Sequence, residues 1–191
     1  KAGIVGDVLF THRGLSGPAV LDLSGTVAQL LDRGRPVPVR NELVAGMDAK
    51  AWARDLESWR SASGGRQVVK LLQQLVPASL CRQVCALAGL DPQVTAAQLS
   101  AARQRELAAT LSGVELTVTA TEGFDAAFVT RGGVKLKEVD PATLRSRVLD
   151  GLYVVGELLD LDGPTGGYNL QWAFASGWLA GLRCRGRGDT P

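Results

Sequence analysis

The sequence has 191 residues, 46% of them hydrophobic, and its 21 basic and 19 acidic residues give a formal net charge of +2. A chain of this length can bury a substantial core, as one large domain or two small ones. The basic residues are scattered apart from a run at residues 183–187, which we interpret as a solvated tail, so neither nucleic acid nor a membrane surface is expected as a partner. No apolar run approaches the roughly 20 residues that a membrane-spanning helix requires.

The cysteines are Cys81, Cys85 and Cys184, and their spacing is not that of a disulfide scaffold. Cys81 and Cys85 are four residues apart within a helical pattern, so they lie on one face of the expected helix. We interpret them as buried free thiols, with a redox pair as the alternative. Because the first residues also lack the apolar core of a secretion signal, we expect a cytoplasmic, reducing setting.

The N-terminal part predicts strands and one helix. Apolar residues between positions 3 and 11 indicate a strand. Pro18 suits the first turn of a helix, and apolar side chains recur every three or four residues from there to about Leu31. Loosely alternating apolar residues at positions 37–44 then indicate a short strand.

A helical block is predicted at about residues 48–112. Asp48 is expected to cap its first helix, and two more helices are predicted before residue 90. Thr95 and Gln98 have the spacing of a capping box, which predicts a fourth helix that continues to Gly113.

The pattern then returns to strands, which we predict at residues 114–120, 126–130, 134–136 and 152–155. Asp140 is expected to cap a short helical turn between the last two. A final helix is predicted from about Asn169. One face of this helix carries small and aromatic residues, namely Leu170, Ala173, Phe174, Gly177, Trp178 and Gly181.

These elements predict an α+β fold in which antiparallel, β-barrel-like strands from both chain ends surround an inserted helical subdomain. We divide the chain into four parts. They are β-rich strands with one helix at residues 1–47, the helical subdomain at 48–112, returning β-strands at 113–140 and a C-terminal segment at 141–191.

The C-terminal segment combines a predicted strand end, an acidic glycine-rich loop and a helix N-terminus. Gly156 ends the strand without a Cβ, and Gly166 and Gly167 stand directly before the helix, so a ligand could approach the backbone closely. The free N–H groups at a helix N-terminus favour an anion. The same residues would also suit an ordinary glycine-rich turn between a strand and a helix.

Three strings carry a family resemblance, and they occur in the family's order along the chain. They are LFTHRGLSGPAVL at residues 9–21, AFVTRGGVKLKEVDP at 127–141 and GLYVVGELLDLDGPTGGYNLQWAFASGWLAG at 151–181. The chain thereby resembles the aminoacetone oxidase-like, BaiN-like family of NAD(P)- and FAD-dependent oxidoreductases. The resemblance implies hydride transfer between flavin and a small organic substrate or NAD(P)H.

The resemblance also implies which residues bind FAD. The final helix N-terminus would stabilise the negative charge that develops near N1 and C2=O of the reduced flavin. The implied FAD-binding residues are Thr130, Gly132, Gly133, Val134, Gly156, Glu157, Gly166, Gly167, Tyr168, Asn169 and Leu170. His12, the only histidine, would be a proton donor or substrate anchor, with a structural role as the alternative.

One feature that the family would require is missing, because no G-x-G-x-x-G turn follows a predicted strand. We therefore expect a C-terminal part of a longer FAD-dependent oxidoreductase, in which residues 151–181 complete a Rossmann-type FAD-binding domain and the isolated chain lacks FAD. The alternative is a truncated, non-catalytic module that binds partners. In either case the apolar C-terminal helix could support self-association.

Two other classes of site are disfavoured. Residues 14–18 are superficially similar to a hydrolase nucleophile elbow around Ser16, but Pro18 stands where the elbow requires glycine. The single histidine, the cysteines and the loop acids match no zinc-site pattern, so no metal is predicted.

Overall fold

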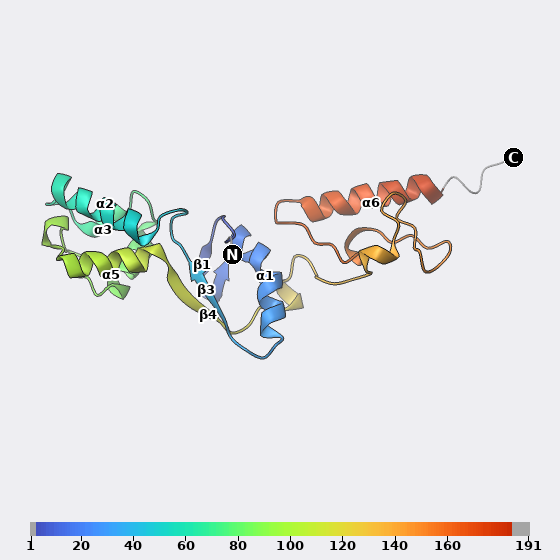
Figure 1. The fold of residues 1–191 in the computed structure, drawn as a ribbon, viewed down its shortest axis with the longest axis horizontal. Helices are drawn as coiled ribbons and strands as arrows, with labels where there is room; N and C mark the ends of the chain where they lie inside the picture. The colour runs from blue at the N-terminus through green and yellow to red at the C-terminus, as the bar shows by residue number, and fades with distance from the viewer. Residues whose placement is uncertain (1–2, 185–191) are drawn as a thin grey trace. The chain divides into compact units, whose positions relative to one another are not determined.

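The structure, a computed structural model, describes residues 3–184. Within that range it contains six α-helices and two separate two-stranded antiparallel sheets, so the fold is mixed α+β (Figure 1). The chain divides into two compact units. One is Pro36–Val118, and the other joins Lys1–Arg35 to Thr119–Pro191.

The Pro36–Val118 unit begins and ends with paired strands, as the apolar alternation predicts. β3 (Val37–Asn41) lies antiparallel to β4 (Val114–Val118), with Val37 opposite Val118. Arg40 Nη2 donates a hydrogen bond of 3.1 Å to the carbonyl oxygen of Ser112, two residues before β4, and so joins β3 to the chain that enters β4. A Cβ at Gly113 would displace the Arg40 guanidinium, so glycine leaves room for this side chain in its present position.

Four helices build the core of this unit. They are α2 (Ala49–Ala62), α3 (Val68–Leu72), α4 (Ala78–Leu87) and α5 (Ala101–Ser112). Helices α2 and α5 lie side by side in Figure 1, and Trp52 of α2 and Leu107 of α5 are fully buried in one cluster. The predicted cap of α2 is confirmed, since Asp48 Oδ1 accepts a hydrogen bond of 2.7 Å from the Ala51 amide.

The predicted fourth helix of the block is two elements. Thr95 and Gln98 do form a capping box, but on the short 3-10 helix η1 (Ala96–Gln98). Ser100 then caps α5 by accepting a hydrogen bond of 3.3 Å from the Arg103 amide. Leu99, between the two, has extended backbone and a buried side chain, so the break in the helix directs this leucine into the core.

In the other unit, β1 (Leu9–Thr11) and β2 (Gly14–Ser16) form a tight hairpin that leads into α1 (Pro18–Leu31). The helix confirms the prediction, with Pro18 in its first turn. The strand predicted from residue 3 is wrong at its start, because residues 3–8 lie outside β1. At Gly17 φ is +99° and an added Cβ would stand 2.6 Å from the Asp7 carbonyl oxygen, so only glycine fits before the helix.

The remainder of this unit is α6 (Tyr168–Cys184) and the irregular chain at residues 134–160 that packs against it. The final helix was predicted from its apolar spacing and is confirmed. Its buried contacts form a small cluster of Val139, Leu144, Val154, Leu159 and Ala180. Asp140 Oδ1 accepts hydrogen bonds from the amides of Ala142 and Thr143 at 2.9 and 3.0 Å, which confirms the predicted capped turn and lowers the pKa of this carboxyl.

The prediction of a barrel-like arrangement is wrong for the described residues, because the β1–β2 and β3–β4 pairs remain separate sheets. The strands predicted at 126–130, 134–136 and 152–155 are also wrong. The chain there forms short 3-10 helices joined by irregular backbone, namely η2 (Phe124–Ala126), η3 (Leu136–Glu138) and η4 (Gly156–Leu158). Residues 119–133 are exposed throughout, so this segment has no buried face that a strand could contribute to a core.

The division of the chain into four parts, with boundaries at residues 47, 112 and 140, stays a prediction. Of the basic run at 183–187, Arg185 and Arg187 lie outside the described residues. None of the helices between residues 3 and 184 combines the length and apolar character needed to cross a membrane.

One face of α6 is uncovered. Leu170, Phe174, Trp178 and Leu182 follow one another at four-residue intervals and are between 54% and 76% exposed; we call these four residues the α6 stripe. Gly177 and Gly181 beside the stripe have open space where a Cβ would stand. The face of small and aromatic residues exists as predicted, but it points to solvent, while Ser176 and Ala180 on the other face are buried.

We predict that the chain self-associates through the α6 stripe, because adjacent exposed apolar side chains lose unfavourable contact with water when they are covered. Sedimentation velocity should show a concentration-dependent shift toward a dimer or larger species. The double variant Phe174→Ser, Trp178→Ser should sediment as a monomer. Leu87→Ser, which removes a comparably exposed leucine from α4, serves as the control and should leave the association unchanged. A wild-type chain that is monomeric at every concentration would contradict this prediction.

The burial of the cysteines allows a prediction of how fast their thiols react. Cys81 and Cys85 are free and buried, which confirms their interpretation as buried thiols, whereas Cys184 is exposed. Burial raises the pKa of the Cys85 thiol to about 11 and also raises the pKa of Cys81, so both stay protonated, and thus poorly nucleophilic, at pH 8. One thiol of three should therefore react rapidly with a thiol reagent at pH 8, and all three after unfolding. Fast labelling of Cys85 in the native protein would show that its burial is incomplete.

Candidate functional site

The loop before α6 is closed by a side chain of the helix itself. Asn169 Oδ1 accepts a hydrogen bond of 2.7 Å from the Gly163 amide, and Asn169 Nδ2 donates one of 2.9 Å to the Gly163 carbonyl oxygen. Both polar atoms of this side chain are thereby engaged with the loop. Asn169 was predicted to bind the cofactor. In the structure its side chain instead closes the loop at residues 163–169.

Two glycines follow within this loop with backbone conformations that other residues rarely adopt. Gly166 has φ +126° and Gly167 has φ +91°. Their amides donate no hydrogen bond to any other residue of the 3–184 range, and a Cβ at Gly167 would meet nothing within 4 Å. Because they precede a helix of 17 residues, these free N–H groups lie at the positive end of its dipole. The loop thus presents a surface suited to an anionic or polarised group.

Thr130 and Glu157, two further predicted site residues, are in direct contact. Glu157 Oε1 accepts hydrogen bonds from the Thr130 amide at 2.5 Å and from Thr130 Oγ1 at 3.0 Å. The two residues are 27 positions apart and belong to otherwise irregular segments. The carboxylate therefore joins the loop at residues 130–134 to the start of η4.

The adjacent glycines of the 130–134 loop have different surroundings. A Cβ at Gly133 would stand 2.5 Å from the Leu158 carbonyl oxygen, because Val134 pairs with the neighbouring chain. The Val134 amide donates to the Leu158 carbonyl oxygen at 2.8 Å, and its carbonyl accepts from the Asp160 amide at 3.0 Å. Gly132, with φ +100°, faces open space. Gly133 was predicted to bind FAD, and the backbone that approaches it in the structure is that of the protein itself.

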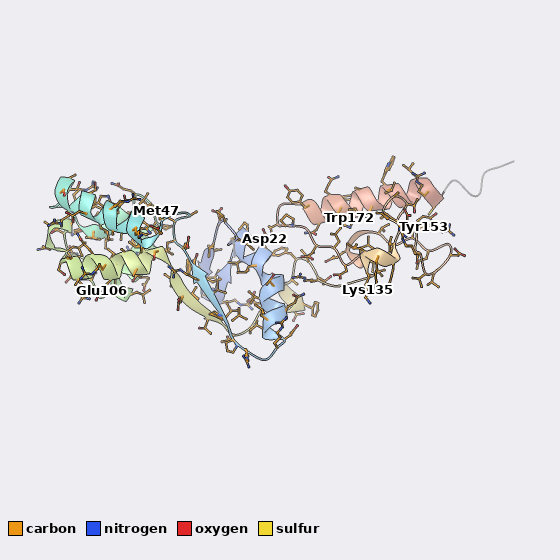
Figure 2. All side chains as sticks on the ribbon, in the orientation of Figure 1. Asp22, Met47, Glu106, Lys135, Tyr153 and Trp172 are labelled. Carbon is orange, nitrogen blue, oxygen red and sulfur yellow. The ribbon has the colours of Figure 1, made fainter. Side chains whose placement is uncertain are left out.

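Gly156 is likewise held against α6. Its amide donates a hydrogen bond of 2.9 Å to Ser176 Oγ, and its carbonyl oxygen accepts one of 3.2 Å from Nε1 of Trp172, which Figure 2 labels. A Cβ on this buried glycine would lie 3.6 Å from Ala173. The positive φ of Gly156, +61°, favours glycine at this position, and both of its backbone polar groups are engaged with the helix.

Helix α1 contacts both loops through residues that the sequence did not single out. Asp22 Oδ1 accepts a hydrogen bond of 2.6 Å from the Thr165 amide. This amide, followed by the Thr165 hydroxyl, lowers the pKa of Asp22. One turn further along α1, the Arg131 guanidinium lies over Gly25, where an added Cβ would be 3.3 Å from Nη1. Ser176 and Asp22 are polar residues inside predicted helices, and no local pattern marks their distant partners.

His12 lies in the two-residue turn between β1 and β2 and is exposed. The turn is stabilised by Thr11, whose Oγ1 accepts from the amides of Arg13 and Gly14 at 3.2 and 3.1 Å. Among the described residues, no hydrogen bond or ion pair joins His12 to the predicted cofactor-binding residues. Its catalytic role stays a prediction.

Two surface depressions of about 270 and 460 Å³ lie elsewhere in this unit. Both are lined by Arg145, Tyr153 and Arg183, and neither includes a predicted cofactor-binding residue. Between residues 3 and 184, no three His, Cys, Asp or Glu side chains come together in a way that could hold a metal ion.

The contrast between the two loop glycines yields a prediction. Both have positive φ, but only a Cβ at Gly133 collides with backbone, so Gly133→Ala should lower the free energy of unfolding by about 1–3 kcal/mol more than Gly132→Ala. Urea unfolding measures the difference. Amide exchange at Val134 and Asp160 should accelerate in the Gly133 variant and change little in the Gly132 control. Equal stability of the two variants would refute the backbone contact at Gly133.

Comparison with known proteins supplies the family. The family described as HI0933-like protein Rossmann domain matches residues 26–183. The chain is 36% identical over 176 residues to 3-dehydro-bile acid delta(4,6)-reductase of Clostridium scindens, covering 92% of this chain and 43% of that protein. It is 36% identical over 172 residues to the ribosomal RNA dihydrouridine synthase of Escherichia coli, covering 90% of this chain and 40% of that protein.

The corresponding synthase of Haemophilus influenzae is 32% identical over 176 residues, covering 92% of this chain and 41% of that protein. The chain therefore spans about two fifths of the length of the curated relatives that it matches. The family match covers most of the described residues, including every loop of the candidate site. The chain belongs to the HI0933-like flavoprotein family.

Proposed function

We propose that this chain forms part of the FAD site of an oxidoreductase that passes a hydride between flavin and a small organic substrate or NAD(P)H. The observation that carries the proposal is the pair of free amides at Gly166 and Gly167, at the N-terminus of α6. An array of this kind suits the charged and polarised groups of a dinucleotide cofactor. The names of the relatives, a reductase and two dihydrouridine synthases, support the oxidoreductase class.

The residues present fit a flavin cofactor at some of the predicted positions. Gly132 and Gly167 leave open space where any side chain would stand, so a planar group can approach the backbone there. Gly133 and Gly156 are occupied by contacts within the protein and serve the site by holding its loops in place. Glu157 contributes in the same way through Thr130.

In this proposal the chain's own groups orient the cofactor and adjust its electrostatics. Flavin, when bound, supplies the hydride chemistry. The dipole of α6 and the free amides before it stabilise negative charge close to the loop. Tyr168 and Leu170 are exposed at 62% and 67% on the first turn of the helix and are available for apolar contacts with the cofactor.

The substrate follows from none of these contacts. The relatives act on a bile acid derivative and on ribosomal RNA, as their names state, so one family serves substrates of different chemistry. For this chain we propose a small organic substrate, with His12 as a proton donor or substrate anchor. The alternative is a non-catalytic, partner-binding module, which the uncovered α6 stripe favours.

FAD titration of the purified chain, followed by flavin fluorescence, tests the proposal. The titration is repeated with the unmatched part of the Clostridium scindens reductase added as a separate polypeptide. We expect binding only with the added polypeptide, because the chain spans about two fifths of that relative and shows no G-x-G-x-x-G turn. Tight binding by the chain alone would place a complete flavin site within it. No binding in either case would favour the partner-binding module.

A matched pair of variants locates the site. Gly167→Glu should weaken FAD binding at least about tenfold, because it sets a carboxylate beside the anionic cofactor. Gly34→Glu is the control, since Gly34 also has positive φ and open surroundings but lies beyond the end of α1. Equal affinities for the two variants would exclude the α6 N-terminus from the site.

A further inference from the structure

We infer that Asp22 is a positioning residue, which holds the glycine-rich loop at residues 163–167 in its cofactor-binding conformation from the side of α1. The inference rests on the proposed flavin function. Asp22 belongs to no motif on which the family resemblance depends for cofactor binding.

The contact is short and spans most of the chain. Asp22 Oδ1 lies 2.6 Å from the Thr165 nitrogen, and the two residues are 143 positions apart. Hydrogen bonds between a carboxylate and a backbone N–H are shorter and stronger than those between neutral groups. Asp22 is the only acidic residue within α1 (Pro18–Leu31), so no other carboxylate of that helix can replace it. Figure 2 labels Asp22 on this helix.

The loop needs such a restraint because of its composition. Gly163, Gly166 and Gly167 give it more conformational freedom than any other residue type would, and ordering it costs correspondingly more. Asn169 fixes the loop at Gly163, and Asp22 fixes it two residues later at Thr165. The two restraints leave the amides of Gly166 and Gly167 without an internal partner. A loop already ordered before binding loses less entropy when the cofactor arrives.

The same face of α1 also contacts the second candidate loop. Gly25 is one turn beyond Asp22, and the Arg131 guanidinium lies directly over it, as the short distance to an added Cβ shows. Arg131 is the neighbour of Thr130 and Gly132, both predicted to contact the cofactor. Helix α1 therefore lies against one residue of each loop, and Asp22 forms its hydrogen bond to the loop that contains the free amides.

The test compares Asp22→Ala with Asp22→Asn, which keeps an oxygen acceptor for the Thr165 amide. Asp32→Ala is the control, because Asp32 is an exposed aspartate at the other end of α1 whose side chain makes no hydrogen bond within the described residues. Amide exchange at Thr165 is measured by NMR in the chain alone. FAD affinity is measured with the unmatched reductase polypeptide present.

We expect Asp22→Ala to accelerate exchange at Thr165 and to weaken FAD binding about threefold to tenfold, the net worth of one solvent-exposed hydrogen bond. Asp22→Asn should restore most of both properties, and Asp32→Ala should change neither. Unchanged exchange at Thr165 in Asp22→Ala, or equal FAD affinity of that variant and the wild type, would overturn the inference. So would an equal loss of affinity in Asp32→Ala, which would indicate a general charge effect.

The two proposals fail in different ways. If the wild-type chain binds no FAD even with the added polypeptide, the flavin function is refuted, and with it any role of Asp22 toward a cofactor. If the wild type binds FAD and Asp22→Ala binds it equally well, the function stands and the positioning role is refuted.

Discussion

The two hydrogen bonds between Gly156 and α6 are the interaction on which the candidate site depends. Residues 134–160 contain no regular strand, so their backbone polar groups cannot be satisfied by a sheet. At Gly156 the helix supplies both partners, Ser176 for the amide and Trp172 for the carbonyl. The Ser176 hydroxyl is itself satisfied, since it donates to the Trp172 carbonyl oxygen at 2.7 Å. Glu157 follows directly, so this contact also places the carboxylate that holds Thr130.

The parts of the fold that could be predicted are those with local causes. Pro18 and the apolar spacing after it define α1, and the Asp48 carboxylate starts α2, because each signal acts within one or two turns. The predictions at 126–130, 134–136 and 152–155 were wrong because a strand requires a distant partner that apolar residues do not identify. The same short apolar runs here form irregular chain that adjoins or overlaps the 3-10 helices.

In the candidate site, too, the sequence identified residues but not their distant partners. Glycines 132, 133, 156 and 167 were all predicted from the family resemblance to bind the cofactor. The structure brings backbone of the protein itself against Gly133, whereas Gly132 and Gly167 face open space. Sequence does not tell whether the approaching group is a ligand or another part of the chain. The contact of Asp22 with Thr165 could not be predicted at all, because 143 residues separate them and neither lies in a capping pattern with the other.

The two units also differ in how completely they bury their apolar residues. In Pro36–Val118 the large hydrophobic residues that remain exposed are Leu75 and Leu87, and a continuous cluster fills the space between the helices. In the other unit, many large hydrophobic residues of the described range are exposed, and the cluster packed against α6 has five buried residues. Only the helical unit therefore has the core expected of an independently stable domain.

The register of β3 and β4 has an evolutionary consequence. Asn41 pairs with Val114, so the chain leaves for the helical block and returns from it at adjacent positions of one ladder. A segment whose two ends meet in this way can be lengthened, shortened or exchanged without altering the pairing of the strands that carry it. The helical block is thus an exchangeable insertion, and a change within it leaves the ladder of β3 and β4 in register.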